Sequence, residues 1–433
     1  MKPTPFLLFL ITGLFLTSVF WIISFNNTVY PAYILIALIA FVFIDYLGLR
    51  TDLKIKINRN IPSVMALHQP VSMSLKISNN TKHNTKLLVY DGLPEFFETD
   101  NQFPALLTLS AQSITELKYN VTPEKRGNFS FTNCSVRIYG RLRLLTRSES
   151  FLLIDHVKVF PDYVPVIEYA MLKTNMRTNL MGIHNVNKRG DGIDFKELRP
   201  YREGDSLRQI DWKSTARQNR TISREYQVEQ DQSFIFLLDC SHRMNSNEDS
   251  LTHFDHVLNA MLLTSYIALK QNDAVGYVAF GNEKLRWKTP KKGTSGFNHL
   301  LEDIYDIQPS HKAADYLSMA ETLPKLHRKS ATVILLTNIR DNDSSEILPA
   351  VKFLSRFYQV IVASITENSV DNEIRKIPSS FEDALTKAAS IQYINSRQKV
   401  INKIRSHNLR LIDIPAKQLP IALANEYLAF KGK

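Results

Sequence analysis

The longest uncharged stretch of the chain lies at its start and constrains the fold more than any other feature. Residues 6–25 contain no Asp, Glu, Lys or Arg, and most of them are apolar. A helix rises about 1.5 Å per residue, so this run reaches about 30 Å, the thickness of the hydrocarbon core of a bilayer. A cleaved signal peptide is the alternative, but another apolar run follows and no small-residue cleavage site separates the two. We therefore predict a membrane-spanning helix here.

A second apolar run, residues 29–49, follows after three polar residues. Its one charged residue, Asp45, is expected to be solvated near the lipid headgroups rather than buried as a functional carboxylate. The connecting turn carries no charge, whereas basic residues flank the pair of runs: Lys2 before it and Arg50, Lys54, Lys56 and Arg59 after it. Positively charged flanks stay in the cytoplasm. Residues 1–50 thus predict a two-helix anchor in the cell membrane, with both termini and the bulk of the chain cytoplasmic.

Composition excludes several classes of protein. The chain has 433 residues, of which 44% are hydrophobic and 22% charged, as in folded globular domains rather than disordered chains. Cys134 and Cys240 are its only cysteines and are far apart, so no disulfide framework is expected. A net charge of +11 suits nucleic acid, an anionic membrane surface, or solubility alone. Most of the surplus falls between residues 51 and 228, which favours membrane lipid as the partner of these charges.

Residues 51–165 read as a β-rich domain. Short runs alternate apolar and polar residues and are separated by turns that hold Asn, Pro or Gly. Period-two alternation at this spacing predicts an antiparallel sandwich. No titratable cluster with metal or catalytic spacing occurs in it, so we expect a spacer or docking module. The predicted strands are residues 53–58, 71–78, 85–90, 105–110, 116–121, 128–140 and 156–160.

Residues 166–228 form a charged signature segment in which acids and bases alternate. Such mixing favours local ion pairs over a stripe that tracks phosphates. Two interpretations compete: a structural ion-pair lattice, which we favour, or a surface that recognises a partner through Arg and Trp side chains. The residues that would form the partner surface are Arg199, Tyr201, Asp205, Arg208, Asp211, Trp212 and Arg217.

A short helix is expected within this segment. Asp205 precedes it and is placed to cap its first turn, and Leu207, Ile210 and Ser214 then share one face. Arg208 and Asp211 are three residues apart on the same helix. An acid and base pair made of Asp205 and Asp211 is a weaker idea, because nothing nearby supplies a nucleophile or an oriented histidine.

Residues 229–433 alternate apolar strands with helices. Such alternation predicts a parallel, doubly wound, Rossmann-like α/β sheet, whose ligands bind at the carboxyl ends of its strands. Asp239 and Ser241 lie at the end of the first strand and are the first candidate site. The predicted strands are residues 233–239, 273–280, 331–337, 359–365 and 410–415, and the predicted helices are 254–270, 296–305, 380–405 and 418–430.

Two motifs resemble known families. The run Asp239–Arg243, D-C-S-H-R, resembles the D-x-S-x-S metal-ion-dependent adhesion motif of von Willebrand factor A domains. The block Gly192–Arg217 is similar to the signature of a bacterial domain-of-unknown-function family, number fifty-eight, in which a membrane hairpin, a β-rich region, this signature and a von Willebrand A-like domain follow in this order. The resemblance covers essentially the whole chain. It implies a non-enzymatic protein-interaction role together with MoxR-type AAA+ ATPases, in the assembly or maturation of client proteins.

The chain departs from the adhesion motif in ways that bear on metal binding. A divalent ion there needs hard oxygen ligands from three loops. Asp239 and Ser241 fit, but Arg243 stands where a hydroxyl is expected, Asp315 is the only substitute for a threonine, and Asn338 replaces a carboxylate. We therefore predict a degenerate site with no cofactor, or weak Mg²⁺ binding through Asp239, Ser241 and Asp315. The Arg243 guanidinium would replace the ion as the partner of Asp239.

The sequence thus predicts a membrane-anchored scaffold that presents the charged segment with Asp239, Ser241, Arg243 and Asn338 to a protein partner. A metal-dependent hydrolase using Asp239, Asp315 and a histidine is the alternative. A nucleic-acid-binding protein is a second one, although no basic stripe interleaved with aromatic residues occurs. We expect no zinc site at the histidines and predict a polar helix face there, because no further ligand is placed to complete a tetrahedron; these histidines are His242, His253 and His256. No glycine-rich phosphate loop occurs, so the chain is not itself the ATPase.

Overall fold

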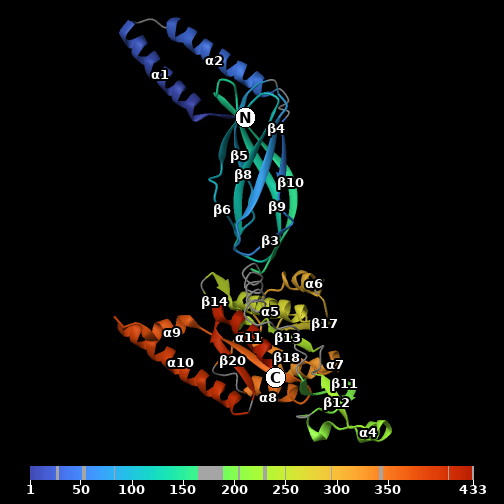
Figure 1. The fold of residues 1–433 in the computed structure, drawn as a ribbon. Helices are drawn as coiled ribbons and strands as arrows, with labels where there is room; N and C mark the ends of the chain where they lie inside the picture. The colour runs from blue at the N-terminus through green and yellow to red at the C-terminus, as the bar shows by residue number, and fades with distance from the viewer. Residues whose placement is uncertain are drawn as a thin grey trace. The chain divides into compact units, whose positions relative to one another are not determined.

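The chain folds into two compact units, Met1–Phe160 and Pro161–Lys433 (Figure 1). The computed structural model describes residues 1–25, 29–50, 55–81, 83–163, 189–202, 205–227, 232–248, 250–293, 295–340, 345–407 and 409–431.

The first unit begins with two apolar helices, α1 (Pro5–Phe25) and α2 (Val29–Arg50). Each contains a twenty-residue segment, Pro5–Ser24 and Pro31–Arg50, that is long and apolar enough to cross a membrane. Most side chains of these segments are exposed in the unit. A helix that is apolar on every side requires an apolar surrounding that the rest of this unit does not provide.

Two β-sheets make up the predicted strand-rich region. All strand pairs are antiparallel except β3 with β10. Inward positions are mostly apolar and outward positions mostly polar. In β2 buried and exposed residues alternate strictly. The first sheet has the order β1 (Lys2–Pro3), β10 (Leu145–Phe160), β9 (Gly127–Tyr139), β5 (Thr85–Asp91) and β7 (Ala105–Leu109), with β3 (Val64–Ala66) also on β10. The second has the order β2 (Ile55–Asn60), β4 (Val71–Asn79), β8 (Ser113–Pro123) and β6 (Phe97–Thr99).

A buried charged cluster joins the two sheets. Arg59 on β2 donates from Nε to Asp91 Oδ2 on β5 over 3.1 Å, and from Nη1 to Asp155 Oδ2 on β10 over 2.9 Å. The Tyr119 hydroxyl on β8 also donates to Asp91. The members of this ion-pair cluster are far apart in the sequence, so no local pattern predicts it. Arg59 is also no membrane flank: burial of its charge requires these carboxylates.

Asp45 connects α2 to the turn between β9 and β10. Contrary to the expectation of a solvated flank, it is only 2% exposed. Its carboxylate accepts three backbone N–H groups, from Leu142 at 2.8 Å, Leu144 at 3.0 Å and Leu145 at 2.9 Å. These donors replace the hydrogen bonds to water that a carboxylate loses on burial. A Cβ atom at Gly140 would collide with the Asp45 carboxylate, so the turn requires glycine there.

Thr4 connects α1 to the same turn. Its hydroxyl donates to the carbonyl oxygen of Arg143 over 2.7 Å and accepts the N–H of Leu7, which caps the start of α1. Near the end of α2, Arg147 Nη1 on β10 donates to the Leu49 carbonyl oxygen over 2.8 Å. The β9–β10 turn is therefore bonded to both apolar helices.

The second unit contains a six-stranded mixed sheet. The strands β13, β16, β18, β19 and β20 are parallel, as predicted, but β17 is antiparallel to β16 at the edge, so the expected all-parallel sheet was wrong. Gly281, at φ +87°, lies in the short connection between β16 and β17, and Pro290 suits only an edge strand. The order is β17 (Arg286–Lys291), β16 (Ala274–Phe280), β13 (Ser233–Asp239), β18 (Thr332–Thr337), β19 (Gln359–Thr366) and β20 (Arg410–Pro415).

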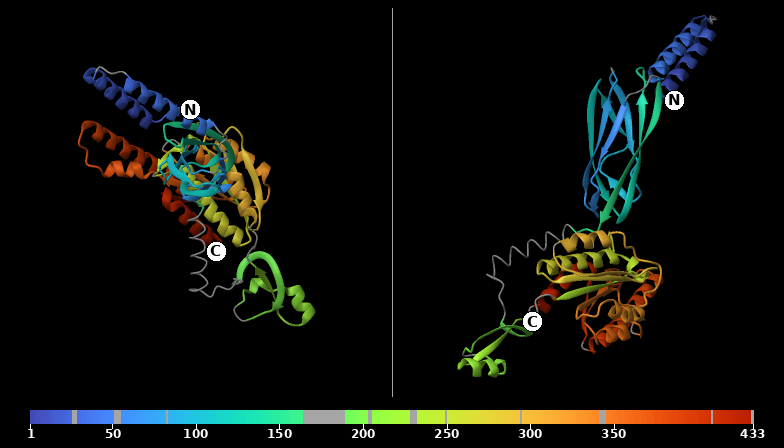
Figure 2. Two further views of the ribbon diagram at one scale, coloured as in Figure 1. Left: turned by 90° about the horizontal axis from the view of Figure 1, so that it is seen from above. Right: turned by 90° about the vertical axis from the view of Figure 1, so that its right-hand side faces the viewer.

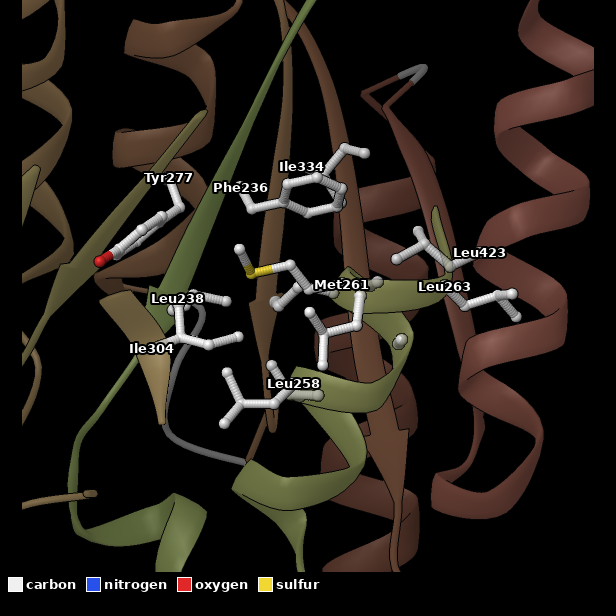
Figure 3. Close-up of a cluster of buried hydrophobic side chains, with 14 of the residues drawn as sticks. Phe236, Leu238, Leu258, Met261, Leu263, Tyr277, Ile304, Ile334 and Leu423 are labelled. Carbon is white, nitrogen blue, oxygen red and sulfur yellow. The ribbon is translucent and has the colours of Figure 1, made fainter. Parts of the chain in front are cut away.

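Helices cover both faces of this sheet (Figure 2). Alternate residues of β13 point to opposite faces: Phe236 and Leu238 pack with one group of helices, and Ile235 and Leu237 with the other. Figure 3 shows the first cluster, with Met261 of α5 lying against β13. The first group is α5 (His253–Lys270), α6 (Ser295–Ile304) and α11 (Leu419–Lys431), and the second is α7 (Tyr316–Leu326), α8 (Ile347–Leu354) and α10 (Phe381–Arg405). The helices α7, α8 and α9 (Asn368–Arg375) were not predicted.

The charged signature segment forms a small β-hairpin with an inserted helix. β11 (Arg189–Pro200) pairs with β12 (Ile222–Gln227) in antiparallel fashion, and α4 (Trp212–Gln218) lies between them in the sequence. The helix predicted directly after Asp205 was wrong. A 3₁₀ turn, η1 (Leu207–Gln209), comes first, and α4 begins later with Asp211 as its N-cap.

The contact between Asp45 and Gly140 allows a prediction for the substitution of Gly140 by alanine. Gly140→Ala places a Cβ where the Asp45 carboxylate lies, so we expect the turn to lose about 2–4 kcal/mol of local stability. Amide hydrogen exchange of the full chain in detergent should show faster exchange at residues 142–145. Gly13→Ala is the control, because its Cβ would meet nothing within 4 Å. Unchanged exchange in Gly140→Ala would show that the junction is not tight.

Candidate functional site

The candidate site lies where two neighbouring parallel strands end. Strand order reverses between β13 and β18, because the chain adds β16 and β17 on one side of β13 and β18 to β20 on the other. In open α/β sheets ligands bind at such a switch point, beyond the carboxyl ends of the strands. Asp239 ends β13, Thr337 ends β18, and Asn338 follows directly. All three residues are completely buried.

The Asp239 carboxylate is surrounded by donors from the protein itself. Its Oδ1 accepts the backbone N–H of Ser241 over 2.9 Å. Its Oδ2 accepts the hydroxyls of Tyr316 and Thr337, each over 2.6 Å. Burial, together with the charge of Asp239, raises the pKa of Tyr316 well above its ordinary value, so the phenol stays protonated and keeps donating. Both carboxylate oxygens therefore have protein partners.

A buried cation lies next to this carboxylate. Arg243 is 6% exposed, and its Nε is 4.0 Å from Asp239 Oδ2. Its Nη1 donates to the carbonyl oxygen of Asn338 over 3.3 Å, and its guanidinium carbon lies 5.6 Å from the centre of the Tyr316 ring. The arginine thus bridges the ends of β13 and β18. The 4.0 Å separation makes it a charge neighbour of Asp239 rather than a close bidentate partner.

The three residues expected to bind a metal lie in different surroundings: two are buried and one is exposed. Asp239 and Ser241 adjoin, and the Ser241 hydroxyl is buried. Asp315 is exposed and accepts the N–H of Ser318 over 2.9 Å as the N-cap of α7. The residue of that loop that contacts Asp239 is Tyr316. Among the residues that the structure describes, no group of three or more His, Cys, Asp or Glu is placed to hold a metal ion.

A second polar cluster adjoins Asn338. Its amide Nδ2 donates to Glu367 Oε1 over 2.7 Å and lies 3.3 Å from His253 Nδ1. His253 Nε2 is 3.6 Å from Glu248 Oε2. His253 and His256 are 2% and 5% exposed, so the predicted polar helix face was wrong. Burial lowers the pKa of His253, against the opposing charge of Glu367.

Acidic residues of the signature segment are held in ion pairs within it. Arg199 binds both oxygens of Asp205, over 2.7 and 2.8 Å. Asp211 accepts the N–H of Ser214 over 3.0 Å and Arg224 Nε over 2.9 Å, and these bonds lower its pKa. Asp205 therefore caps no helix, and Asp211 pairs with Arg224 rather than with Arg208 on a shared helix face. Such local ion pairs are what the structural interpretation of the segment predicts.

Other side chains of the segment point into solvent. Trp212 is 70% exposed and Leu207 is 72% exposed. Arg208 and Arg217 are exposed as well, whereas Tyr201 is half-buried and donates to the Asp205 carbonyl oxygen over 3.2 Å. Large exposed apolar side chains beside arginines are typical of contact surfaces for other molecules. The predicted partner residues thus fall into two groups: Asp205 and Asp211 are held in ion pairs, whereas Trp212 and the arginines near it are exposed.

Comparison with known proteins gives a family match over part of the chain. The family described as "Protein of unknown function DUF58" matches residues 197–387, from the signature segment into the α/β unit. A relative in Bacillus subtilis (strain 168), the uncharacterized protein YeaD, is 23% identical over 223 residues, which are 50% of this chain and 53% of YeaD. The chain therefore spans about half the length of the curated relative that it matches.

Similarity to solved structures is weak. Escherichia coli alpha-2-macroglobulin in its native conformation is 20% identical, with a TM-score of 0.20, over 24% of this chain and 6% of its own. The ASH / PapD-like domain of human CEP192 is 13% identical, with a TM-score of 0.18, over 24% of this chain and 84% of its own. TM-scores this low support no argument about the fold.

The buried His253 predicts how stability depends on pH. Because folding lowers its pKa below the unfolded value of 6.5, the unfolded state takes up the proton first as pH falls. The contribution of His253 to the free energy of unfolding is therefore fully present above pH 6.5. It decreases as the pH falls from 6.5 to the lower pKa of the folded state. Thermal unfolding of the full chain in detergent at several pH values should show a smaller decrease for His253→Gln. His299→Gln, an exposed histidine on α6, is the control. An equal decrease in all three proteins would contradict the prediction.

Proposed function

We propose that this chain is a member of the DUF58 family over its whole length and acts as a membrane-anchored protein-interaction scaffold rather than an enzyme. The observation that carries the proposal is that the Asp239 carboxylate is buried and already hydrogen-bonded to groups of the protein. Both carboxylate oxygens bind protein donors, and a buried arginine lies 4.0 Å away. A catalytic site would instead present a nucleophile and a base to a substrate. The exposed side chains of the second unit that suit a protein contact include Trp212, Leu207 and Arg208.

The C-terminal unit is proposed to be a von Willebrand A-like domain. A mixed sheet with one antiparallel edge strand, helices on both faces and an Asp-x-Ser run after the first central strand support this. The two apolar helices are proposed to cross the inner membrane of a bacterium. Exposed Lys2 and Arg50 flank the pair, which supports cytoplasmic termini and a cytoplasmic location for the bulk of the chain.

The partner is proposed to be a MoxR-type AAA+ ATPase, which would act with this chain on a client protein. Resemblance of the signature block to its family supports this choice, and exposed Trp212, Leu207, Arg208 and Arg217 form the contact surface we favour. A metal-dependent hydrolase has less support, because Asp315 caps α7 and the described residues include no metal-ligand group. The net charge of +11 is compatible with nucleic-acid binding but suits an anionic membrane equally well.

Magnesium titration tests the degenerate adhesion site. We expect no micromolar Mg²⁺ binding by the full chain in calorimetry. The Arg243 cation lies beside the Asp239 carboxylate, and the Tyr316 and Thr337 hydroxyls already donate to Asp239 Oδ2. Arg243→Ser removes the cation and adds a hydroxyl, so we expect it to strengthen Mg²⁺ binding. Arg356→Ser, an exposed arginine of the same unit, should not. Micromolar binding by the unmodified chain that Asp239→Ala abolishes would contradict the proposal.

Binding to the ATPase tests the proposed partner surface. We expect the full chain in lipid nanodiscs to bind the purified MoxR-type ATPase of its own organism. Trp212→Ala should weaken binding about tenfold or more, because exposed Trp residues form the energetic centres of interfaces. Phe357→Ala, an aromatic residue 52% exposed in the same unit, is the matched control in biolayer interferometry. No binding by the unmodified chain, or equal effects of both changes, would contradict the proposal.

A further inference from the structure

The β9–β10 turn, residues 140–145, lies at the level of the last turns of an apolar helix. Asp45, which binds the Leu142, Leu144 and Leu145 amides, is five positions before the end of the segment Pro31–Arg50. Five helical residues span about 8 Å. The turn is also bonded to Thr4, at the start of the other apolar helix. If the two helices cross a bilayer, this turn lies in the interfacial region.

The side chains at the tip of the turn suit that region. Leu142 is 39% exposed, and Arg141 and Arg143 on either side of it are exposed. Arg143 adopts φ +59°, a left-handed conformation that costs an L-residue about 1 kcal/mol. The Asp45 and Thr4 bonds hold the turn in that shape. An apolar side chain between two arginines is the arrangement of segments that lie in a membrane interface.

Further cations surround the tip. Lys2 on β1 and Arg50 at the end of α2 are both exposed. Within the part of the chain that the structure describes, no ion pair joins Lys2, Arg50, Arg141 or Arg143 to a carboxylate. The nearby carboxylates already have partners: Asp45 binds amides, and Glu149 pairs with Arg147 over 2.6 Å. The rim of the turn is therefore positively charged and available to anions.

We propose that the β9–β10 turn is a binding surface for the headgroups of anionic phospholipids. Leu142 enters the boundary between headgroups and acyl chains, while Arg141, Arg143, Lys2 and Arg50 bind lipid phosphates. The surface rests on the proposed membrane insertion of α1 and α2. It adds a lipid site to the strand-rich region, outside the helices themselves. Each basic residue near an anionic membrane contributes about 1 kcal/mol, so a rim of cations makes binding depend on lipid charge.

A fluorescent probe at the tip tests the proposal. Cys134 and Cys240 are buried, and burial raises the pKa of Cys134 to about 12, so an added surface cysteine can be labelled selectively. Leu142→Cys keeps the backbone amide that Asp45 needs. The matched control is Ser63→Cys, whose carbonyl oxygen accepts the Lys158 N–H at the other end of β10, about 40 Å away.

The labelled full chains are placed in nanodiscs that contain phosphatidylglycerol and a lipid with a spin label on its headgroup. We expect quenching of the Leu142→Cys probe to be several-fold stronger than that of the Ser63→Cys probe. Equal quenching in nanodiscs that retain the protein would overturn the lipid surface but leave the membrane anchor intact. Failure of the unmodified chain to remain with the nanodiscs would overturn both proposals.

Lipid charge gives a second, independent measurement. Replacing phosphatidylglycerol with phosphatidylcholine should lower the quenching at position 142. Arg141→Gln with Arg143→Gln should reduce that difference by about half, because Lys2 and Arg50 remain. Lys125→Gln with Lys158→Gln, at the far end of the strands, is the charge-matched control and should preserve it. Quenching that is independent of lipid charge would overturn the role of the arginines in binding anionic headgroups.

Discussion

The Asp45 carboxylate, held by three backbone amides, is the interaction on which the first unit depends. Its donors lie 97 to 100 residues away in the sequence, so this one side chain joins a terminal helix to the long β9–β10 pair. Desolvating a carboxylate costs several kcal/mol unless donors replace the lost water. The turn must therefore form for the Asp45 carboxylate to be buried with its donors, and Gly140 must lack a side chain for the turn to approach. Helices and strands are one unit for this reason.

The same constraint operates at two other places. Asp91 joins the two sheets of the first unit through Arg59 and Tyr119, and Asp239 joins β13 to β18 through Thr337 and Tyr316. Each carboxylate is completely or almost completely buried, and each obtains two or more of its hydrogen bonds from distant segments. Apolar packing determines which faces are buried, whereas these acids determine how neighbouring elements register with one another.

Sequence reasoning found the long apolar runs and the capped helices but missed several short elements, among them the helices α7, α8 and α9. The apolar helices, most long strands, and α5 and α10 follow from runs or capping boxes that need no tertiary information. The edge strand β17 reads as a loop, because RWKTPK is polar and contains Pro290. At the site, Asp239 and Ser241 were found from their motif and strand end. Tyr316 and the burial of Asp45 gave no local signal, since each depends on a partner at least 77 residues away.

The distribution of satisfied and exposed polar groups bears on function. In the C-terminal unit, the residues at the strand ends bond mainly to one another, and a ligand that reached Asp239 would have to displace two hydroxyls and a backbone amide. Such displacement is costly, because every group removed must find a new partner in a buried site. Trp212 and Leu207 are already exposed, so another surface can bury their apolar area without breaking a buried hydrogen bond. Binding through exposed surfaces, as we propose, is therefore the energetically simpler use of this chain.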